Sequence, residues 1–330
     1  MSRDKWVFVL AASLISLISL TFYFFYPLLD GIVMGIVFGY VAKPVKKRLE
    51  QKMGRFPSSL ISTLIIIVPI SFLMFYGIFQ GVNQLIHILT HQSEFEASFV
   101  GALRNAGIDE KYIQQVRELI PTLASIAQSK LKLSVIDATF KAVMFFMNFV
   151  ISVIVCFYVL LDADRFIERL LKVLPEDRRE EFSKFIKEVD ETFLGLWFGN
   201  FVVAMLIGIA SVPFFLFFNI PYTPLLSGLM FLAALIPVFA EWMVLAPIAV
   251  FLGLKDVWLA VWFTVLGFIF LYFLPEVILR PYFVGYTSKI HPLVLMLSFI
   301  GGAVVGGVSG FFIAPMLAGL ITAVYNYYTK

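Results

Sequence analysis

The stretch LWFGNFVVAMLIGIASVPFFLFFNIPYTPLLSGLMFLAALIPVFAEWMVLAPIAVFL, residues 196–252, contains a single charged residue, Glu241. A helix needs about 20 predominantly apolar residues to cross the hydrocarbon core of a bilayer. The stretch supplies one such run over Leu196–Phe218 and a second over Pro224–Leu252, and the second is longer than one crossing requires. The stretch therefore predicts chain that is embedded in a membrane.

The composition of the whole chain agrees with this prediction. Of the 330 residues, 61% are hydrophobic and 14% are charged, against roughly 45–50% and 25% in soluble domains. This balance excludes a soluble enzyme, a disordered chain and a basic protein that binds nucleic acid. The net charge of +3 is too small to indicate a polyanionic partner. A single cysteine, Cys156, excludes a disulfide framework.

Apolar runs of suitable length recur along the chain and predict an all-α integral membrane protein with about eight transmembrane helices. The runs are Trp6–Tyr26, Leu28–Val45, Ser58–Phe79, Ala142–Leu161, Leu196–Phe218, Pro224–Leu252, Val257–Leu279 and His291–Tyr325. Pro224–Leu252 and His291–Tyr325 are longer than one bilayer thickness requires, and they are expected to be broken or re-entrant.

These runs divide the chain into five parts. We expect three spans in residues 1–80, an outer helical segment in 81–141, a fourth span in 142–161, cytoplasmic amphipathic helices in 162–195, and a C-terminal transport core in 196–330. The core contains two units, each an ordinary span followed by a long run interrupted by proline or glycine. Paired broken segments of this kind are typical of transporter sites.

The distribution of Lys and Arg predicts the orientation. If each run crosses once and the N-terminus is inside, 17 of the 25 basic residues lie in inner segments, Lys255 among them. Of the other eight, six lie in the long stretch 81–141, and Arg280 is one of the remaining two. Basic residues favour the cytoplasmic side of short loops. Both termini are therefore expected to be cytoplasmic.

Glycines four residues apart occur in three places, where they would allow helix backbones to approach closely. They are Gly31, Gly35 and Gly39; Gly195 and Gly199; and Gly302, Gly306 and Gly310. Such surfaces can pack helices within one subunit, or they can form a contact between subunits or a sliding surface.

The candidate transport site is the interrupted run around Pro237. A proline inside a helix leaves the carbonyl four residues earlier without its donor, so Pro237 would free Ala233 and Pro247 would free Met243. In lipid such carbonyls need other partners. Glu241 adds a carboxylate at a similar depth, where a charge is costly and usually functional. The alternatives are that Glu241 binds a neighbouring helix or lies in an oligomer interface.

A second acidic residue, Glu276, lies one turn before Arg280, so we expect an ion pair between them, near the outer face. Enzyme motifs are missing from the sequence: it has no nucleotide-binding G-x-x-x-x-G-K-[ST] loop and no H-E-x-x-H pair. His87 and His91 have no third ligand nearby, which predicts no metal site. We expect neither enzymatic activity nor a cofactor.

Several short pieces, taken in order, resemble the autoinducer-2 exporter family of prokaryotic membrane proteins. They are Tyr158–Asp162, Leu174-Pro175, Ile220-Pro221-Tyr222, Ile236-Pro237, Pro247, Leu279-Arg280-Pro281, His291–Val294 and Gly306–Pro315. Where the family usually continues with Gly-Pro after Ile236-Pro237, this chain has Ala240-Glu241.

The resemblance implies a multi-pass protein of the prokaryotic inner membrane that assembles as a homo-oligomer such as a pentamer. It also implies export of a small polar solute like autoinducer-2, or exchange of Na⁺ for H⁺. A passive channel and a membrane scaffold without transport are the competing interpretations of the sequence.

Overall fold

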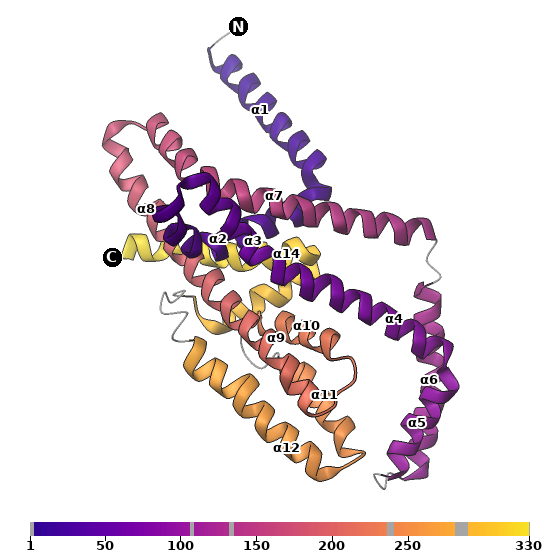
Figure 1. The fold of residues 1–330 in the computed structure, drawn as a ribbon. Helices are drawn as coiled ribbons and strands as arrows, with labels where there is room; N and C mark the ends of the chain where they lie inside the picture. The colour runs from indigo at the N-terminus through magenta and orange to yellow at the C-terminus, as the bar shows by residue number, and fades with distance from the viewer. Residues whose placement is uncertain (1–2, 106–108, 132–134, 236–240, 281–289, 330) are drawn as a thin grey trace.

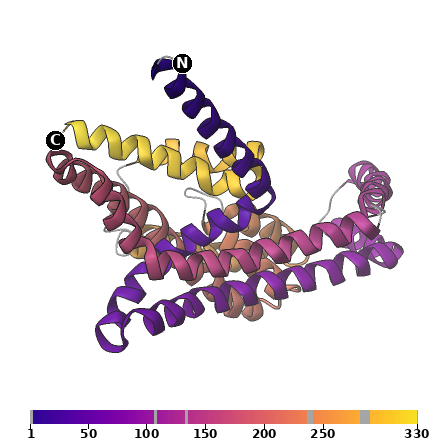
Figure 2. The ribbon, with the colours of Figure 1, turned by 90° about the horizontal axis from the view of Figure 1, so that it is seen from above.

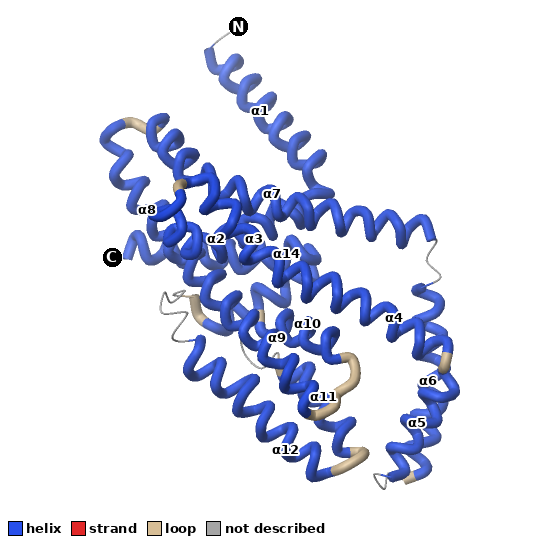
Figure 3. The backbone as a smooth tube through the Cα atoms, viewed as in Figure 1, coloured by secondary structure: helices blue, strands red, loops and turns tan. Residues whose placement is uncertain are grey.

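The computed structural model describes residues 3–105, 109–131, 135–235, 241–280 and 290–329. About 94% of the described residues are helical, and they include no strand. Figure 1 shows long helices α2, α3, α4 and α7 above a second group formed by α9 to α12, with α14 beside both groups. Figure 3 shows that only short loops and turns join the described helices.

The first group is built around α2, which packs along α7. Its elements are α1 (Arg3–Phe25), η1 (Tyr26–Leu28), α2 (Leu29–Met53), α3 (Arg55–Ser71), the π-helical turn η2 (Phe72–Tyr76), α4 (Gly77–Thr90) and α7 (Val135–Val173). The helix α1 stands apart from the bundle in two views (Figures 1 and 2), and its side chains from Ala12 onward are exposed.

Glycines decide how closely α2 approaches α7. A Cβ atom at Gly31 would overlap the backbone of Asn148, and one at Gly39 would lie 2.7 Å from Val159 Cγ1. Gly35 is equally close to Val155. The first glycine set therefore allows two helices of one chain to pack closely. This is the first of the two uses that the sequence left open, packing within one subunit.

Two helices lie outside this bundle, at the end where α4 and α7 project (Figure 1): α5 (Gln92–Asn105) and α6 (Glu110–Leu131). They share a small apolar cluster of Val100, Leu103 and Ile113. Leu254, from the C-terminal half, packs against the same cluster. We call this end of the molecule the α5–α6 end.

The opposite end carries α8 (Glu176–Leu194), and we call it the α8 end. Lys43 in the second half of α2 forms an ion pair with Asp190 there, with a distance of 2.5 Å from Nζ to Oδ1. The chain then continues through the π-helical turn η3 (Gly195–Gly199), whose glycines are buried, into α9 (Asn200–Phe217). The helix α9 runs from the α8 end toward the α5–α6 end.

The run that was expected over Pro224–Leu252 is divided into two short helices, α10 (Thr223–Ala234) and α11 (Trp242–Gly253). The chain enters α10 just after Phe218, and it leaves α11 at Leu254. The ring of Phe218 lies 5.2 Å from that of Phe263, in the second turn of α12. Both ends of the α10–α11 pair therefore lie at the α5–α6 end, and we call this pair the first hairpin.

The next helix is antiparallel to α9. It comprises α12 (Val257–Gly267) and the π-helical stretches η4 (Phe268–Phe273) and η5 (Pro275–Leu279). Phe214 near the end of α9 lies 5.3 Å, ring to ring, from Phe263 near the start of α12. At the other end Arg280 contacts Asn200, the first residue of α9. The helix therefore returns the chain to the α8 end.

The last helix, α14 (Pro292–Thr329), folds back on itself at Gly307, whose φ of 58° and ψ of −134° are non-helical. The backbones of Gly302 and Gly310 touch across this bend, although eight residues of straight helix would separate them by about 12 Å. Gly319 and Ile290 also lie together, beside Phe193 of α8. We call the two arms of α14 the second hairpin, and both of its ends lie at the α8 end.

The C-terminal part therefore contains two similar units in opposite orientation. Each unit is a long helix, α9 or α12 with η4 and η5, followed by a hairpin. Because α9 and α12 are antiparallel, the first hairpin enters the bundle from the α5–α6 end and the second from the α8 end. This arrangement is an inverted repeat of a span and a re-entrant segment.

Five helices among the described residues are long and apolar enough to cross a membrane: Ala12–Met53, Thr139–Val173, Glu176–Phe217, Val257–Leu279 and Leu293–Thr329. The helices α3, α10 and α11 are apolar but shorter. The expected count of eight separate spans is not confirmed, because two expected runs share Ala12–Met53 and a third is split between α10 and α11.

The expected sides of two basic residues are wrong. The sequence scheme placed Lys255 at the end that carries residues 162–191, and Arg280 at the opposite end. In the structure Lys255 follows Leu254 at the α5–α6 end, and Arg280 lies at the α8 end. The reason is that residues 224–252 were counted as one crossing, whereas α10 and α11 return the chain to the end from which it entered.

Candidate transport site

Arg280 joins three elements at the α8 end of the C-terminal helices. Its Nε lies 2.6 Å from Oε2 of Glu276, so the ion pair expected from the sequence is present. Its Nη1 donates to Oδ1 of Asn200 at 2.5 Å, and its Nη2 donates to the carbonyl oxygen of Ala234 at 3.4 Å. A planar guanidinium has enough donors for all three contacts. Arg280 thereby connects η5 to the start of α9 and to the end of α10.

Glu241 lies beside this cluster, immediately before α11. Its side chain is fully buried, and among the described residues neither carboxylate oxygen has a hydrogen-bond partner. Glu276 and Arg280 are the charged side chains that act on it electrostatically, and Tyr272 is within reach of the same three groups. A buried carboxylate without hydrogen bonds is costly, because nothing replaces the water that it has lost. A buried carboxylate of this kind within apolar chain is a candidate for a functional site.

The sequence predicts four other candidate residues in the interrupted run: Ala233, Pro237, Met243 and Pro247. Pro237 lies outside the described residues. Ala233 is in the last turn of α10, but the carbonyl that receives the guanidinium belongs to its neighbour Ala234. Pro247 lies within α11 and cannot donate to the Met243 carbonyl. The Met243 side chain is 78% exposed and therefore faces away from the buried cluster.

The cluster is closed in this conformation. The side chain of Glu276 is 20% exposed and that of Arg280 is 13% exposed, while Glu241 is wholly enclosed. One oxygen of Glu276, Oε1, also lacks a hydrogen-bond partner among the residues that the structure describes. The arrangement can hold a cation or a protonated group between two carboxylates and a carbonyl once an entrance opens. Arg280 would neutralise part of the negative charge when that ligand leaves.

The second hairpin lies next to this cluster. Trp197, one turn before Asn200, contacts both arms of the hairpin: its ring lies 5.9 Å from Phe299 and 5.4 Å from Phe312. The second hairpin therefore contacts η3 within about one turn of Asn200, where Arg280 of the cluster contacts α9. A movement of either hairpin would change the packing around Asn200.

Two members of the cluster were not among the residues that the sequence singled out. Asn200 and Tyr272 are polar residues within long apolar runs, and that isolation is a signal that could have identified them. His87 in the last turn of α4 and His91 just after that helix lie elsewhere, with their rings stacked 4.4 Å apart. Among the described residues there is no group of three His, Cys, Asp or Glu that could hold a metal ion.

The fold and the cluster define a multi-pass α-helical membrane protein whose C-terminal part is built from two inverted units. The sequence profile described as AI-2E family transporter matches residues 12–330. The chain belongs to this family of membrane transporters.

Relatives with similar sequences include a protein of Archaeoglobus fulgidus that is 58% identical over 325 residues, covering 98% of this chain and 95% of that protein. A protein of Methanocaldococcus jannaschii is 27% identical over 68% of this chain and 64% of its own length. YueF of Bacillus subtilis is 27% identical over 52% and 46%, respectively. All three are named "Putative transport protein".

Proposed function

We propose that this protein is a secondary transporter that carries a small polar solute or a cation by alternating access, with Glu241 as the charged group of the site. The observation that carries this proposal is the buried carboxylate of Glu241, which lacks a hydrogen-bond partner among the described residues and lies beside Glu276 and Arg280.

The inverted arrangement of the two units supports the same proposal. Inverted repeats whose discontinuous helices meet inside the membrane form the sites of many secondary transporters. Here α10 ends at the cluster, and α11 begins there with Trp242, directly after Glu241. Each half-helix places a terminus with unpaired backbone groups next to the site. A passive channel would need an open path, whereas Glu241 is fully enclosed.

The finer assignments follow the family. We propose export, with a solute like autoinducer-2 or a Na⁺/H⁺ exchange as the two candidate activities. We also propose a homo-oligomer, with a pentamer as the first candidate. The helix α1 supports assembly, because its apolar side chains project from the bundle and are free to pack against a neighbouring subunit in the membrane.

The positions of basic residues support an orientation with the α8 end in the cytoplasm. With Lys255 moved to the outer side and Arg280 moved to the inner side, the inner segments still hold 17 of the 25 Lys and Arg residues. Lys289 lies outside the described residues and is not moved. The excess of basic residues on the α8 side, which the positive-inside rule requires, is therefore kept.

The proposal is tested by flux into proteoliposomes that contain the purified full chain. A small panel of polar solutes and ²²Na⁺ is offered at two pH values, with and without a sodium gradient. A transporter gives saturable flux and counterflow, a channel gives flux that follows only the solute gradient, and a scaffold gives none.

The matched variants are Glu241→Gln, which keeps the shape and removes the charge, and Glu180→Gln on the exposed face of α8. We expect Glu241→Gln to lose flux or its pH dependence while it remains folded, and Glu180→Gln to behave as the unchanged protein. Normal flux and an unaltered pH profile in Glu241→Gln would make Glu241 structural and would move the site to residues 291–315.

A further inference from the structure

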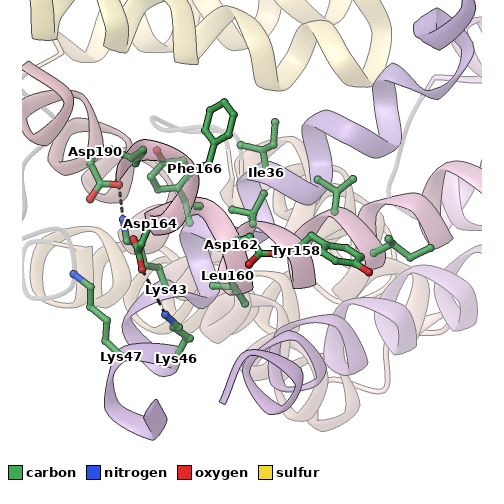
Figure 4. Close-up of a pocket in the computed structure, with 17 residues that line it drawn as sticks. Ile36, Lys43, Lys46, Lys47, Tyr158, Leu160, Asp162, Asp164, Phe166 and Asp190 are labelled. Atoms are coloured by element: carbon green, nitrogen blue, oxygen red, sulfur yellow. Dashed lines mark hydrogen bonds and ion pairs between the residues drawn. The ribbon is translucent and has the colours of Figure 1, made fainter. Parts of the chain in front are cut away.

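A cavity of about 640 Å³ lies between α2 and α7 and reaches Asp190 of α8 (Figure 4). Its apolar part is lined by Ile36 and Val155, and its charged part by Lys43, Lys47 and Asp190. Because α2 runs toward the α8 end, the charged residues lie at that end and the apolar residues lie deeper along the helix. The deeper part of the cavity is therefore apolar, and its charges gather at the α8 end, where Phe166 and Ile167 also line it.

The acidic residues of this cavity already have basic partners. Asp190 pairs with Lys43 at 2.5 Å, and Asp162 pairs with Arg165 at 3.4 Å. Asp164 lies 3.7 Å from Lys46 and is shared with Arg55 at the same distance. Three negative charges in the lining are thus balanced within the protein.

Lys47 also lines the charged part of the cavity, but it differs from these ion-paired residues in its environment. It is exposed, and among the described residues no ion pair includes it. Figure 4 shows its amine apart from the two ion pairs that are drawn with dashed lines. Of the six basic residues in the segment 43–55, Lys43, Lys46 and Arg55 take part in these ion pairs. Arg48 and Lys52, like Lys47, are in no ion pair among the described residues, so they add to the positive charge near this end. The charged end of the cavity therefore favours an anion.

We propose that this cavity binds one anionic phospholipid, with its phosphodiester on Lys47 and an acyl chain along Ile36 and Val155. Basic pockets between membrane helices on the cytoplasmic side bind anionic lipid headgroups. A phosphodiester carries one negative charge, which Lys47 matches. The apolar walls would be buried by an acyl chain, and they offer nothing to a free inorganic anion. The site does not involve Glu241, so it stands independently of the proposed transport activity.

The test measures lipid bound to the purified full chain in detergent by native mass spectrometry. Phosphatidylglycerol, phosphatidylcholine and inorganic phosphate are titrated separately and in competition. We expect one phosphatidylglycerol per chain to be retained preferentially over phosphatidylcholine and not to be displaced by phosphate. Equal retention of the two lipids would overturn the proposal, and displacement by phosphate would assign the site to a free anion.

Two variants locate the site. Lys47→Gln should weaken phosphatidylglycerol binding about fivefold, because one lysine near a membrane surface contributes about 1 kcal/mol. The matched control is Lys184→Gln, an exposed lysine of α8 outside the cavity, which should leave binding unchanged. Ala163→Trp, in the cavity wall, should exclude the lipid. If Lys47→Gln melts at the same temperature as the unchanged protein and retains the same amount of phosphatidylglycerol, the proposal is wrong.

Discussion

Oδ1 of Asp30 accepts a hydrogen bond from the backbone N–H of Ser309 at 2.8 Å, although the two residues are 279 positions apart. Asp30 lies in the first turn of α2, and Ser309 lies just after the bend at Gly307. The second arm of α14 therefore begins with an N–H group that a carboxylate satisfies. A helix start buried in a membrane needs such a partner, because lipid supplies none. This contact fastens the tip of the second hairpin to α2.

Replacing Asp30 by Ala should destabilise the protein. Loss of a side chain that caps a helix start costs about 1 kcal/mol, and here the freed N–H has little access to water. The midpoint of thermal unfolding in detergent should fall, while Asp177→Ala, an exposed acidic residue in the first turn of α8, should change it little. An equal effect of the two substitutions would show that Asp30 does not hold the hairpin.

Leucine at Gly302 should disrupt the second hairpin, whereas leucine at Gly306 should be tolerated. A side chain at Gly302 would overlap the backbone of Gly310, but a Cβ at Gly306 has no heavy atom within 4 Å. Overpacking of this kind costs about 1–3 kcal/mol. Thermal unfolding and size-exclusion profiles of the two variants provide the comparison. If Gly306→Leu is the more damaging change, residues outside this chain pack against Gly306.

Cysteine labelling should place Lys255 on the side of residue 93 and opposite to residue 183. Leu254 packs against the α5–α6 cluster, so an impermeant maleimide added outside cells should label Lys255→Cys and Ser93→Cys but not Ser183→Cys. The background is Cys156→Ser, which removes the single native thiol. Labelling of Lys255→Cys together with Ser183→Cys would restore a single crossing for residues 224–252.

Breaking the Glu276–Arg280 ion pair from one side should be more damaging than removing both charges. Arg280→Gln leaves Glu276 mostly buried without its partner, and such losses cost several kcal/mol. The double variant Glu276→Gln, Arg280→Gln should recover part of the lost stability. Unfolding midpoints of the two single variants and the double variant measure this coupling, and strictly additive effects would contradict it.

Much of the organisation could be predicted from the sequence by itself. The low charge and long apolar runs identify a helical membrane protein, because the cost of placing backbone and charge in lipid acts on every residue locally. The break near Pro237 and the ion pair of Glu276 with Arg280 also follow from local rules, since both depend on residues within about one helical turn. The isolation of Glu241 between apolar residues marked it as a candidate in the same way.

Only the tertiary structure decided where these elements lie relative to one another. Hydropathy measures how apolar a segment is, but it does not state whether the segment crosses or returns, so Lys255 and Arg280 were placed at the wrong ends. The contact of Arg280 with Asn200 joins residues 80 positions apart, and no local pattern encodes it. Gly302 and Gly306 likewise look equivalent in the sequence. They differ because packing across the bend at Gly307 presses one against Gly310 and leaves open space around the other.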